Sequence, residues 1–349
     1  MVVVVGAGVA GLACARELER RSVPAVTLER ARSVGGRCAT RRVQGQAVDH
    51  GLPFLQARSW EFGKELREAG EDRLIPGWPV RVREPRLAVQ ADAYKPGLRR
   101  MAHRDGVSAF ARHLARGLDV RLGHRVERLS ATSGRITAHL RGGRRLAAPL
   151  LVLAGALPES LALAEPMVRD WPGAEEKLAR LRAVRVLPTV TVIAGYPPET
   201  PEPPFDAWHP IEATMLGSIF HDSTKRRAPR WRVLVLHGRT AFSEAALDRK
   251  PEEWSRELVW EAGELLGEWA ASPAWTQTYV WRAGQVRSGD QLNGPVAFES
   301  DGGARVMLAG DAFAADPGLE GAYLSGIAVG EQIAVHPEVK KRIGRRVAG

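Results

Sequence analysis

The sequence predicts an α/β fold that combines a discontinuous Rossmann-type domain with a second α+β domain built on an antiparallel sheet. A strand, a glycine-rich turn and a helix are expected at the N-terminus, and the same succession is expected again near the C-terminus. Apolar, partly alternating runs between them predict the antiparallel strands. The 349 residues, 44% of them hydrophobic, suffice for one large core or two medium ones.

The N-terminal pattern is typical of a dinucleotide-binding βαβ unit. Val2–Val5 is a β-branched run typical of a buried parallel strand, and residues 6–11 read G-x-G-x-x-G. Residues 12–21 are expected to form a helix, and residues 25–28 a second strand that ends at Glu29. Because strand, turn, helix, second strand and acid occur in register, the sequence predicts a bound dinucleotide.

Each part of this unit has a physical role. Gly6 permits the tight turn, Gly8 lets the backbone approach a pyrophosphate, and Gly11 lets the helix pack on the strand. The helix N-terminus offers N–H groups to the phosphates, and Glu29 can accept hydrogen bonds from the adenosine ribose. The residues expected to contact the dinucleotide here are Gly6, Gly8, Val9, Ala10, Gly11, Glu29 and Arg30.

A glycine pair follows this unit. Residues 32–40 read R-x-x-G-G-R-x-x-T, in which Gly35 and Gly36 let the loop pass close to the cofactor and Arg37 can neutralise a pyrophosphate. The pattern resembles the glycine-pair signature of the flavin amine oxidase superfamily. That resemblance implies FAD as the dinucleotide.

The same resemblance assigns further residues. A D-x-G-x-x-aromatic stretch at residues 49–54 implies that His50, Gly51 and Leu52 run along the isoalloxazine ring. It also implies that Val126 brackets the adenine through its backbone, and Ala154 would pass near the adenosine.

The C-terminal segment is expected to be the second flavin anchor. Residues 305–309 form an apolar strand that delivers Gly310 and Asp311, whose carboxylate can hold a ribityl hydroxyl. Gly321 and Ala322 can begin a helix whose N-terminus faces the flavin pyrimidine edge. Residues 310–326 contain no cysteine, so the sequence predicts FAD bound without a covalent link.

Local likenesses point more narrowly to the renalase-like branch of this superfamily. They are D-G-V-S-A-F-A-R-H-L at 105–114, H-D-S-T-K at 221–225, W-R-V-L-V-L-H at 231–237 and V-W-R-A at 280–283. That branch usually has a histidine two residues before its W-R pair, where this chain has Tyr279. The resemblance implies an FAD-dependent oxidase that takes hydride from 2- and 6-dihydro isomers of NAD(P)H and reduces O2 to H2O2. An FAD-dependent amine oxidase is the alternative, and a flavin-binding protein without turnover is the second alternative.

Such an enzyme needs to position its substrate against the flavin and to exclude water from the site, more than it needs acid–base groups. The expected pocket walls are therefore aromatic: Tyr279, Trp281, Phe313 and Tyr323, with His50 as a further candidate catalytic residue. Arg282 is expected either to meet a substrate phosphate or to form an ion pair. Lys95 and Lys225 are expected to be solvated at the surface.

The cofactor pieces define the expected domains, with the flavin ring at their interface. The FAD-binding domain is expected to comprise residues 1–55, 105–160 and 290–335, and the substrate domain residues 56–104 and 161–289, followed by a tail at 336–349.

Composition narrows the function classes further. The net charge is +10, but the arginines are scattered and no nucleic-acid motif occurs, which favours a small anionic ligand over a duplex. Cys14 and Cys38 predict neither a disulfide framework nor a metal site, and a cytoplasmic setting follows as the default. No segment is long and apolar enough to span a membrane, so a membrane partner is not expected. The oligomeric state stays open.

Overall fold

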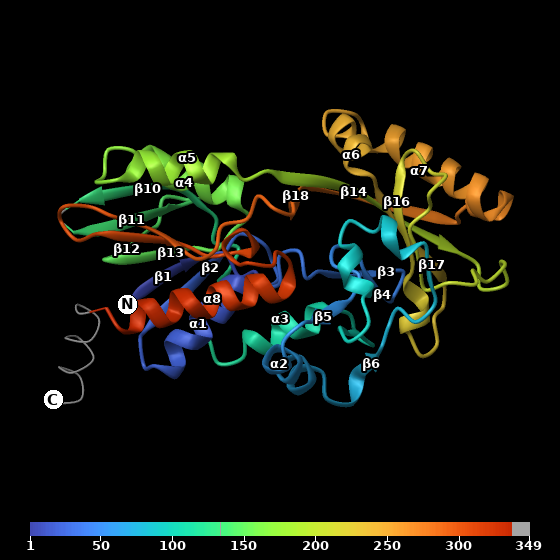
Figure 1. Ribbon diagram of the computed structural model, residues 1–349, viewed down its shortest axis with the longest axis horizontal. Helices are drawn as coiled ribbons and strands as arrows, with labels where there is room; N and C mark the ends of the chain where they lie inside the picture. Colours follow the sequence, from blue (N-terminus) through green and yellow to red (C-terminus); the bar gives the residue numbers. More distant parts are fainter. Residues whose placement is uncertain (133, 337–349) are drawn as a thin grey trace. The chain divides into compact units, whose positions relative to one another are not determined.

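The computed structural model describes residues 1–132 and 134–336 (Figure 1). They divide into two compact units. The first unit contains Met1–Gly36, Ala111–Val186 and the described residues from Val286 onward, and the second contains Arg37–Phe110 and Leu187–Gln285. The α/β fold with a Rossmann-like domain is confirmed.

A six-stranded sheet forms the centre of the first unit, in the order β19-β20-β13-β1-β2-β9. All neighbouring pairs are parallel except β19 and β20, which are antiparallel. The strands are β1 Val2–Val5, β2 Ala25–Glu29, β9 Val120–Leu122, β13 Leu150–Leu153, β19 Val296–Glu299 and β20 Arg305–Leu308. A smaller antiparallel sheet consists of β10 Val126–Thr132, β11 Arg135–Leu140 and β12 Arg145–Ala148.

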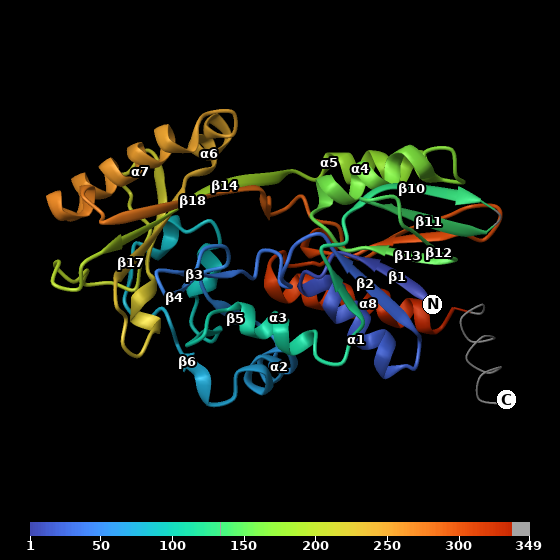
Figure 2. The same cartoon turned by 180° about the vertical axis from the view of Figure 1, so that it is seen from behind.

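Both faces of the six-stranded sheet are covered, which explains why its central strands are continuously apolar. Figures 1 and 2 show α1 and α8 on one side of β1 and β2, and α4 and α5 on the other. Along β1, Val3 packs in the core on the α4 and α5 side, whereas Val2 and Val4 pack against α1 and α8. The helices are α1 Val9–Arg20, α4 Leu157–Val168, α5 Ala174–Ala183 and α8 Leu319–Ala334, with the 3-10 turn η6 Asp311–Phe313.

A second six-stranded sheet, in the order β18-β14-β17-β16-β15-β7, organises the second unit. It is antiparallel from β14 to β15, and β15 is parallel to β7. Its strands are β7 Val82–Arg83, β14 Val186–Tyr196, β15 Ala207–Trp208, β16 Leu216–His221, β17 Arg232–Gly238 and β18 Trp275–Val286. Two small sheets join it: the hairpin β3 Thr40–Val43 with β4 Gln46–Asp49, and β5 Leu55–Ala57 with β8 Arg99–His103 and β6 Leu74–Pro76.

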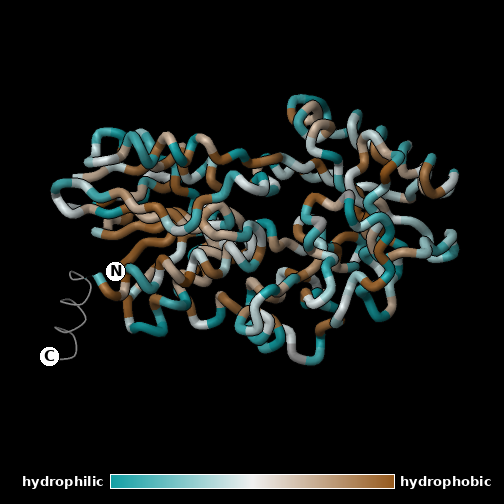
Figure 3. Tube along the Cα trace, viewed as in Figure 1, coloured by the Kyte–Doolittle hydropathy of each residue, from teal (hydrophilic) through white to brown (hydrophobic). Residues whose placement is uncertain are grey.

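The second unit also has apolar residues on both faces of its main sheet. On β14, Val190 and Val192 pack with Trp254 of α7, whereas Ile193 packs with Val48 of β4. Figure 3 shows these strands as hydrophobic stretches of the trace. The remaining helices are α2 Trp60–Gly70, α3 Ser108–Leu114, α6 Thr240–Ala246 and α7 Pro251–Leu266. The 3-10 turns are η1 Glu71–Arg73, η2 Pro85–Leu87, η3 Ala91–Tyr94, η4 Asp222–Lys225 and η5 Glu268–Ala271.

The compact units differ from the expected domain limits at four places, of which residues 105–110 and 286–289 are short. Residues 37–55 group with the second unit, because Val43 and Val48 of the β3-β4 hairpin join its core. Residues 161–186 group with the first unit, because Ala164 and Leu178 of α4 and α5 join the core beneath its sheet. Which unit binds FAD and which binds substrate stays a prediction.

Candidate functional site

The turn between β1 and α1 has the backbone geometry that its glycines predict. Gly6 has φ +104°, a conformation that residues with a side chain rarely adopt. A Cβ on Gly11 would lie 1.9 Å from the carbonyl oxygen of Gly6, so only glycine allows α1 to start this close to β1. At Gly8, by contrast, a Cβ would meet only the carbonyl oxygen of Ala154, at 3.9 Å.

The second glycine loop lies against the first. The backbone N–H of Gly35 donates to the carbonyl oxygen of Ala7 at 2.9 Å, and Gly8 and Gly35 form an isolated β-bridge. No acidic side chain lies in the first turn of α1. A turn lined by glycine backbone at the N-terminus of a helix fits the pyrophosphate of a dinucleotide, since it offers N–H groups and the positive end of the helix dipole.

Glu29 holds the same turn through both of its carboxylate oxygens. Oε2 accepts the backbone N–H of Ala7 and Oε1 that of Ala31, each at 2.8 Å, and the side chain is buried. Each carboxylate oxygen has two acceptor positions, so the group retains capacity for ribose hydroxyls. Arg30 is exposed and paired with Glu159 at 2.9 Å.

Two further predicted cofactor residues lie near the glycine turn or in the core of the first unit. The N–H of Ala154 donates to the carbonyl oxygen of Val5 at 2.8 Å, which places Ala154 beside Gly6. Val126 is buried in the first-unit core, so any contact with adenine would come from its backbone.

The C-terminal anchor begins at the end of β20. Gly310 donates its N–H to Ser325 Oγ of α8 at 3.1 Å, and Asp311 is buried at the start of η6. A Cβ on Gly321 would lie 2.0 Å from the carbonyl oxygen of Asp316, so the first turn of α8 requires glycine there. Glu320 adds a carboxylate to that turn and partly offsets the positive end of the helix dipole.

The helix α8 begins at Leu319, two residues before the expected start, which puts Gly321 and Ala322 within its first turn. Tyr323, a predicted pocket wall, is half-buried on α8 in the first unit. Phe313 is buried in the first-unit core, so its ring packs there instead of forming an exposed wall.

In the second unit, the chain from Asp49 to Pro53 is tightly confined. A Cβ on Gly51 would lie 2.3 Å from the carbonyl oxygen of Arg37, and Leu52 donates its N–H to that same oxygen at 2.9 Å. Trp281 Nε1 donates to the carbonyl oxygen of His50 at 3.0 Å. The guanidinium of Arg37, predicted to meet the pyrophosphate, donates to the carbonyl oxygen of Gly284 at 3.3 Å.

Three predicted catalytic residues come together here. The ring of His50 lies 4.9 Å from Tyr279 and 5.4 Å from Trp281, measured between centroids, and Tyr279 and Trp281 are 4.3 Å apart. Burial, aided by the positive charge of Arg41, lowers the pKa of His50 to about 4. His50 is therefore a neutral imidazole near neutral pH. Arg282 is exposed and donates to the carbonyl oxygen of Leu247 at 3.3 Å.

A cavity of about 620 Å³ opens within the second unit. Its lining is largely polar: Arg41, Arg42, Pro251, Glu252, Ser255, Thr276, Gln277 and Thr278. Arg41 also makes a cation–π contact with Tyr279, because its guanidinium carbon lies 5.4 Å from the centroid of that ring. The two arginines were not among the predicted site residues, and only their adjacency to the R-x-x-G-G-R loop signalled them.

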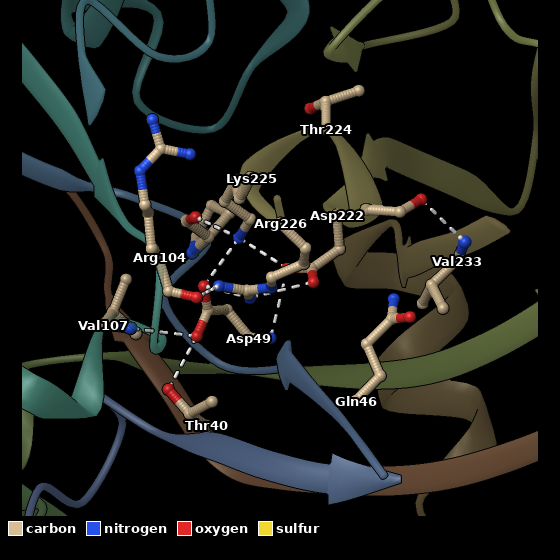
Figure 4. Close-up of polar contacts among 12 residues, drawn as sticks. Thr40, Gln46, Asp49, Arg104, Val107, Asp222, Thr224, Lys225, Arg226 and Val233 are labelled. Atoms are coloured by element: carbon tan, nitrogen blue, oxygen red, sulfur yellow. Dashed lines mark hydrogen bonds and ion pairs between the residues drawn. The ribbon is translucent and has the colours of Figure 1, made fainter. Parts of the chain in front are cut away.

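Four buried charges lie behind the Asp49–Pro53 segment (Figure 4). Lys225 Nζ lies 2.7 Å from Asp49 Oδ2 and 2.5 Å from Asp222 Oδ1, and Arg226 Nη2 lies 3.0 Å and 2.9 Å from the same two carboxylates. The expectation that Lys225 is solvated at the surface is wrong, because its side chain is 0% exposed. Burial would raise the pKa of Asp49, but Lys225 and Arg226 lower it to about 2.

Two further features of the described residues bear on function. No helix among them is long and apolar enough to cross a membrane. Within the same part of the chain, no group of three or more His, Cys, Asp or Glu side chains could hold a metal ion. Cys14 and Cys38 are both buried and unbridged.

The sequence matches two family models. That of the flavin containing amine oxidoreductases covers residues 57–334. That of the NAD(P)-binding Rossmann-like domain covers residues 4–66. A comparison with curated proteins gave no match.

Several solved structures are similar over nearly the whole chain. One is a protein assigned as a protoporphyrinogen oxidase from Exiguobacterium sp. 255-15, with 15% identity, a TM-score of 0.72, and coverage of 96% of this chain and 98% of that chain. Putrescine oxidase bound to putrescine has 14% identity and a TM-score of 0.70, with coverage of 96% and 99%. Cyclohexylamine oxidase from Brevibacterium oxydans IH-35A has 15% identity and a TM-score of 0.65, with coverage of 95% and 98%.

At these identities the structural likeness concerns the fold. The family match rests on the sequence and spans most of the chain, and the glycine turn, Glu29 and the second glycine loop fit a dinucleotide. The chain therefore belongs to the flavin-containing amine oxidoreductase family, and the protein is an FAD-dependent oxidoreductase.

Proposed function

We propose that the protein is an oxidase of isomeric dihydronicotinamides, the 2- and 6-dihydro forms of NAD(P), as in the renalase-like branch. The observation that supports this most is the cavity with Arg41 and Arg42 in its lining, since Arg41 also contacts the ring of Tyr279. Two guanidinium groups suit a substrate that carries a pyrophosphate, because each offers a planar fork of donors. The same two charges repel an alkylammonium ion, and only Glu252 in the lining opposes them.

The overall reaction balances with oxygen as the final acceptor: dihydro-NAD(P), O2 and one proton give NAD(P)+ and H2O2. When bound, FAD supplies the hydride acceptor and the route for two electrons to O2. The residues of this chain position the substrate and exclude water from the site. Tyr279 and Trp281 offer aromatic faces to the nicotinamide, and neutral His50 brings no charge that would oppose formation of the cationic product.

FAD retention is assigned to the predicted cofactor residues of both units. In the first unit the proposed contacts are Gly6, Gly8, Val9, Ala10, Gly11, Glu29, Arg30, Gly35, Gly36, Val126, Ala154, Gly310, Asp311, Gly321 and Ala322. In the second unit they are Arg37, His50, Gly51 and Leu52. Tyr323 is retained as a substrate-pocket candidate, and binding without a covalent link is part of the proposal.

An amine oxidase is the second candidate. Two observations favour it: the family match, and the likeness of fold to a putrescine oxidase and a cyclohexylamine oxidase. The paired rings of Tyr279 and Trp281 would suit the neutral form of an amine as well. The arginines of the cavity give such a substrate nothing to bind, which ranks this candidate second.

Turnover with a matched set of donors separates the two candidates. The FAD-loaded protein is supplied with 2- and 6-dihydro-NAD, ordinary NADH, putrescine and cyclohexylamine, and H2O2 formation is followed. The proposal expects H2O2 from the two isomeric dihydronicotinamides at rates well above those from NADH and both amines. H2O2 from an amine alone would assign the protein to the second candidate.

Substituting the cavity arginines tests the role given to the cavity. We expect Arg41→Gln and Arg42→Gln each to raise KM for 6-dihydro-NAD about tenfold, because a charge-assisted hydrogen bond contributes about 1.5–3 kcal/mol. The KM of the matching nicotinamide riboside, which lacks phosphates, should stay within about twofold. Arg141→Gln, an exposed arginine of the first unit, is the control. Equal losses for both donors would contradict a phosphate-binding role.

A further inference from the structure

The segment Asp49–Pro53 is tied at both ends to one turn of 3-10 helix, η4. At its start, the N–H of Asp49 donates to Asp222 Oδ1 at 3.1 Å. At its end, the carbonyl oxygen of Pro53 accepts from Lys225 Nζ at 3.0 Å. Figure 4 shows Asp49, Asp222 and Lys225 pointing toward one another. Two residues of η4 therefore set where a five-residue stretch of backbone lies.

These four charges share a dense set of contacts, and among them only Arg226 Nε is buried without a hydrogen-bond partner. Asp49 Oδ1 accepts from Thr40 Oγ1 at 2.6 Å and from the N–H of Val107 at 2.9 Å, while Oδ2 accepts from Lys225 and Arg226. Arg226 also donates to two backbone carbonyl oxygens, those of His103 and Arg104. Two carboxylates and two cations balance, so moving any one leaves an unpaired buried charge, which is costly.

Buried ion pairs are weak evidence for stability, because well-packed apolar residues of similar volume often stabilise a fold equally well. A cluster with this many contacts does, however, restrict geometry. On the other side of the segment, Gly51 is packed against Arg37 and Trp281, and Trp281 Nε1 binds the carbonyl oxygen of His50. The segment is thus held from two sides, by charges on one and by a tryptophan on the other.

We propose that Asp222 and Lys225 are positioning residues of the flavin reaction. They fix the backbone of Asp49–Pro53, and through it the ring of His50 and the indole of Trp281, in one arrangement toward FAD and substrate. The inference rests on the proposed assignment of His50, Gly51 and Leu52 to the flavin. Neither Asp222 nor Lys225 is assigned a contact with FAD or with substrate.

Asp222→Asn tests this with little change in shape. The double variant Asp222→Asn with Lys225→Met keeps the cluster neutral, with Asp49 and Arg226 remaining, and serves if the single variant folds poorly. Glu261→Gln is the matched control. Glu261 is another buried carboxylate of the second unit, and it accepts the backbone N–H groups of Thr214, Met215 and Leu216, none of which lies in the segment.

Three readouts on the FAD-loaded proteins are compared. Hydrogen exchange should speed up at least about tenfold at the amides of Asp49–Leu52 in the Asp222 variants, and not in Glu261→Gln. Visible circular dichroism of the bound flavin should change in the Asp222 variants alone. The kcat should fall about tenfold to 100-fold with KM nearly unchanged, because the loss is one of alignment and not of substrate contact.

The outcomes separate this inference from the substrate proposal. Visible circular dichroism and exchange require no donor, so they decide the matter even if the wild-type protein oxidises amines. Exchange and dichroism no different from Glu261→Gln would overturn the inference and leave the cluster a part of the core. Faster exchange with unchanged dichroism and kcat would overturn it too, since the segment would then have no bearing on the flavin.

Discussion

Glu29 shows how one side chain can organise a glycine-rich turn. One carboxylate oxygen accepts the backbone N–H of Ala7 and the other accepts that of Ala31, each at 2.8 Å. The backbone carbonyl oxygen of Glu29 accepts the N–H of His124 at 2.7 Å, which connects the end of β2 to the residues that follow β9. The residue therefore shapes the turn before any ribose is bound.

We expect Glu29→Ala to raise the dissociation constant of FAD about tenfold to 100-fold, since charge-assisted hydrogen bonds of about 1.5–3 kcal/mol are lost. Titration of the flavin-free protein with FAD, followed by flavin fluorescence, measures this. Glu19→Ala, an exposed glutamate on α1, is the control. Equal affinity in wild type and Glu29→Ala would mean that the dinucleotide lies elsewhere.

Residues differ in how far the sequence reveals them. Gly6, Gly11 and Glu29 are predictable because their roles follow from local spacing within a single βαβ unit. Lys225 is not, because its main partner Asp49 is 176 positions away along the chain. In the sequence, Asp222 and Lys225 look like an ordinary solvated pair, and only the tertiary fold shows that both are fully buried.

At the scale of elements, the close packing of α8 on α1 depends on small residues. A Cβ on Gly326 would lie 2.1 Å from the carbonyl oxygen of Ala10, and one on Gly330 would lie 2.8 Å from Cβ of Glu17. The sequence pattern did not identify α1 as the partner of α8, because the two helices are about 300 residues apart along the chain.

We expect Gly326→Val to destabilise the protein by about 3 kcal/mol or more, because overpacking against backbone cannot be relieved by a rotamer change. Urea unfolding followed by far-UV circular dichroism checks this. Gln332→Val, at an exposed position of the same helix, should change the midpoint little. A wild-type midpoint in Gly326→Val would show that α1 and α8 are not packed this tightly.

Other elements were foreseen to different degrees. The strands at β14, β16, β17 and β18 follow from apolar, partly alternating runs, and α7 starts at Pro251, where proline is favoured as a first helical residue. The β3-β4 hairpin was assigned to the FAD-binding domain on the basis of its motif. Its place in the second unit follows from packing of Val43 and Val48, which a motif does not report.

At the scale of the whole molecule, buried histidines make stability depend on pH. Burial, the largest cause in each case, lowers the pKa of His50, His209 and His221 from 6.5 to about 4. In the unfolded chain these side chains bind protons once the pH falls below about 6.5. In the folded protein they do so only near pH 4. Their contribution to the free energy of unfolding is therefore complete above pH 6.5 and is lost progressively as the pH falls toward 4.

We expect the urea midpoint of the FAD-loaded protein to fall steadily between pH 6.5 and pH 4. Each pH unit in this window is worth about 1.4 kcal/mol for each such histidine. In the variant His209→Asn, which removes a ring bonded to Tyr94 and Ser218, the dependence on pH should be shallower. A midpoint that is flat over this window in wild type would show that these imidazoles are protonated inside the fold.

The family and the cofactor can be predicted from the sequence because flavin-binding motifs are compact and recur at both ends of the chain. The substrate cannot be predicted in the same way. The cavity with Arg41 and Arg42 is assembled from β3 and from the start of α7 and β18, which lie more than 200 residues after β3. In addition, Tyr279 departs from the histidine of the renalase-like pattern. Under the proposed function, specificity is thus a property of the second unit as folded.

The most direct test of the proposed function is anaerobic mixing of the FAD-loaded protein with 2- or 6-dihydro-NAD, with the visible flavin band followed in time. The account predicts rapid bleaching, and much slower bleaching with ordinary NADH. No bleaching with either isomer, together with bleaching by an amine, would contradict it and would make Tyr279 the first residue to re-examine.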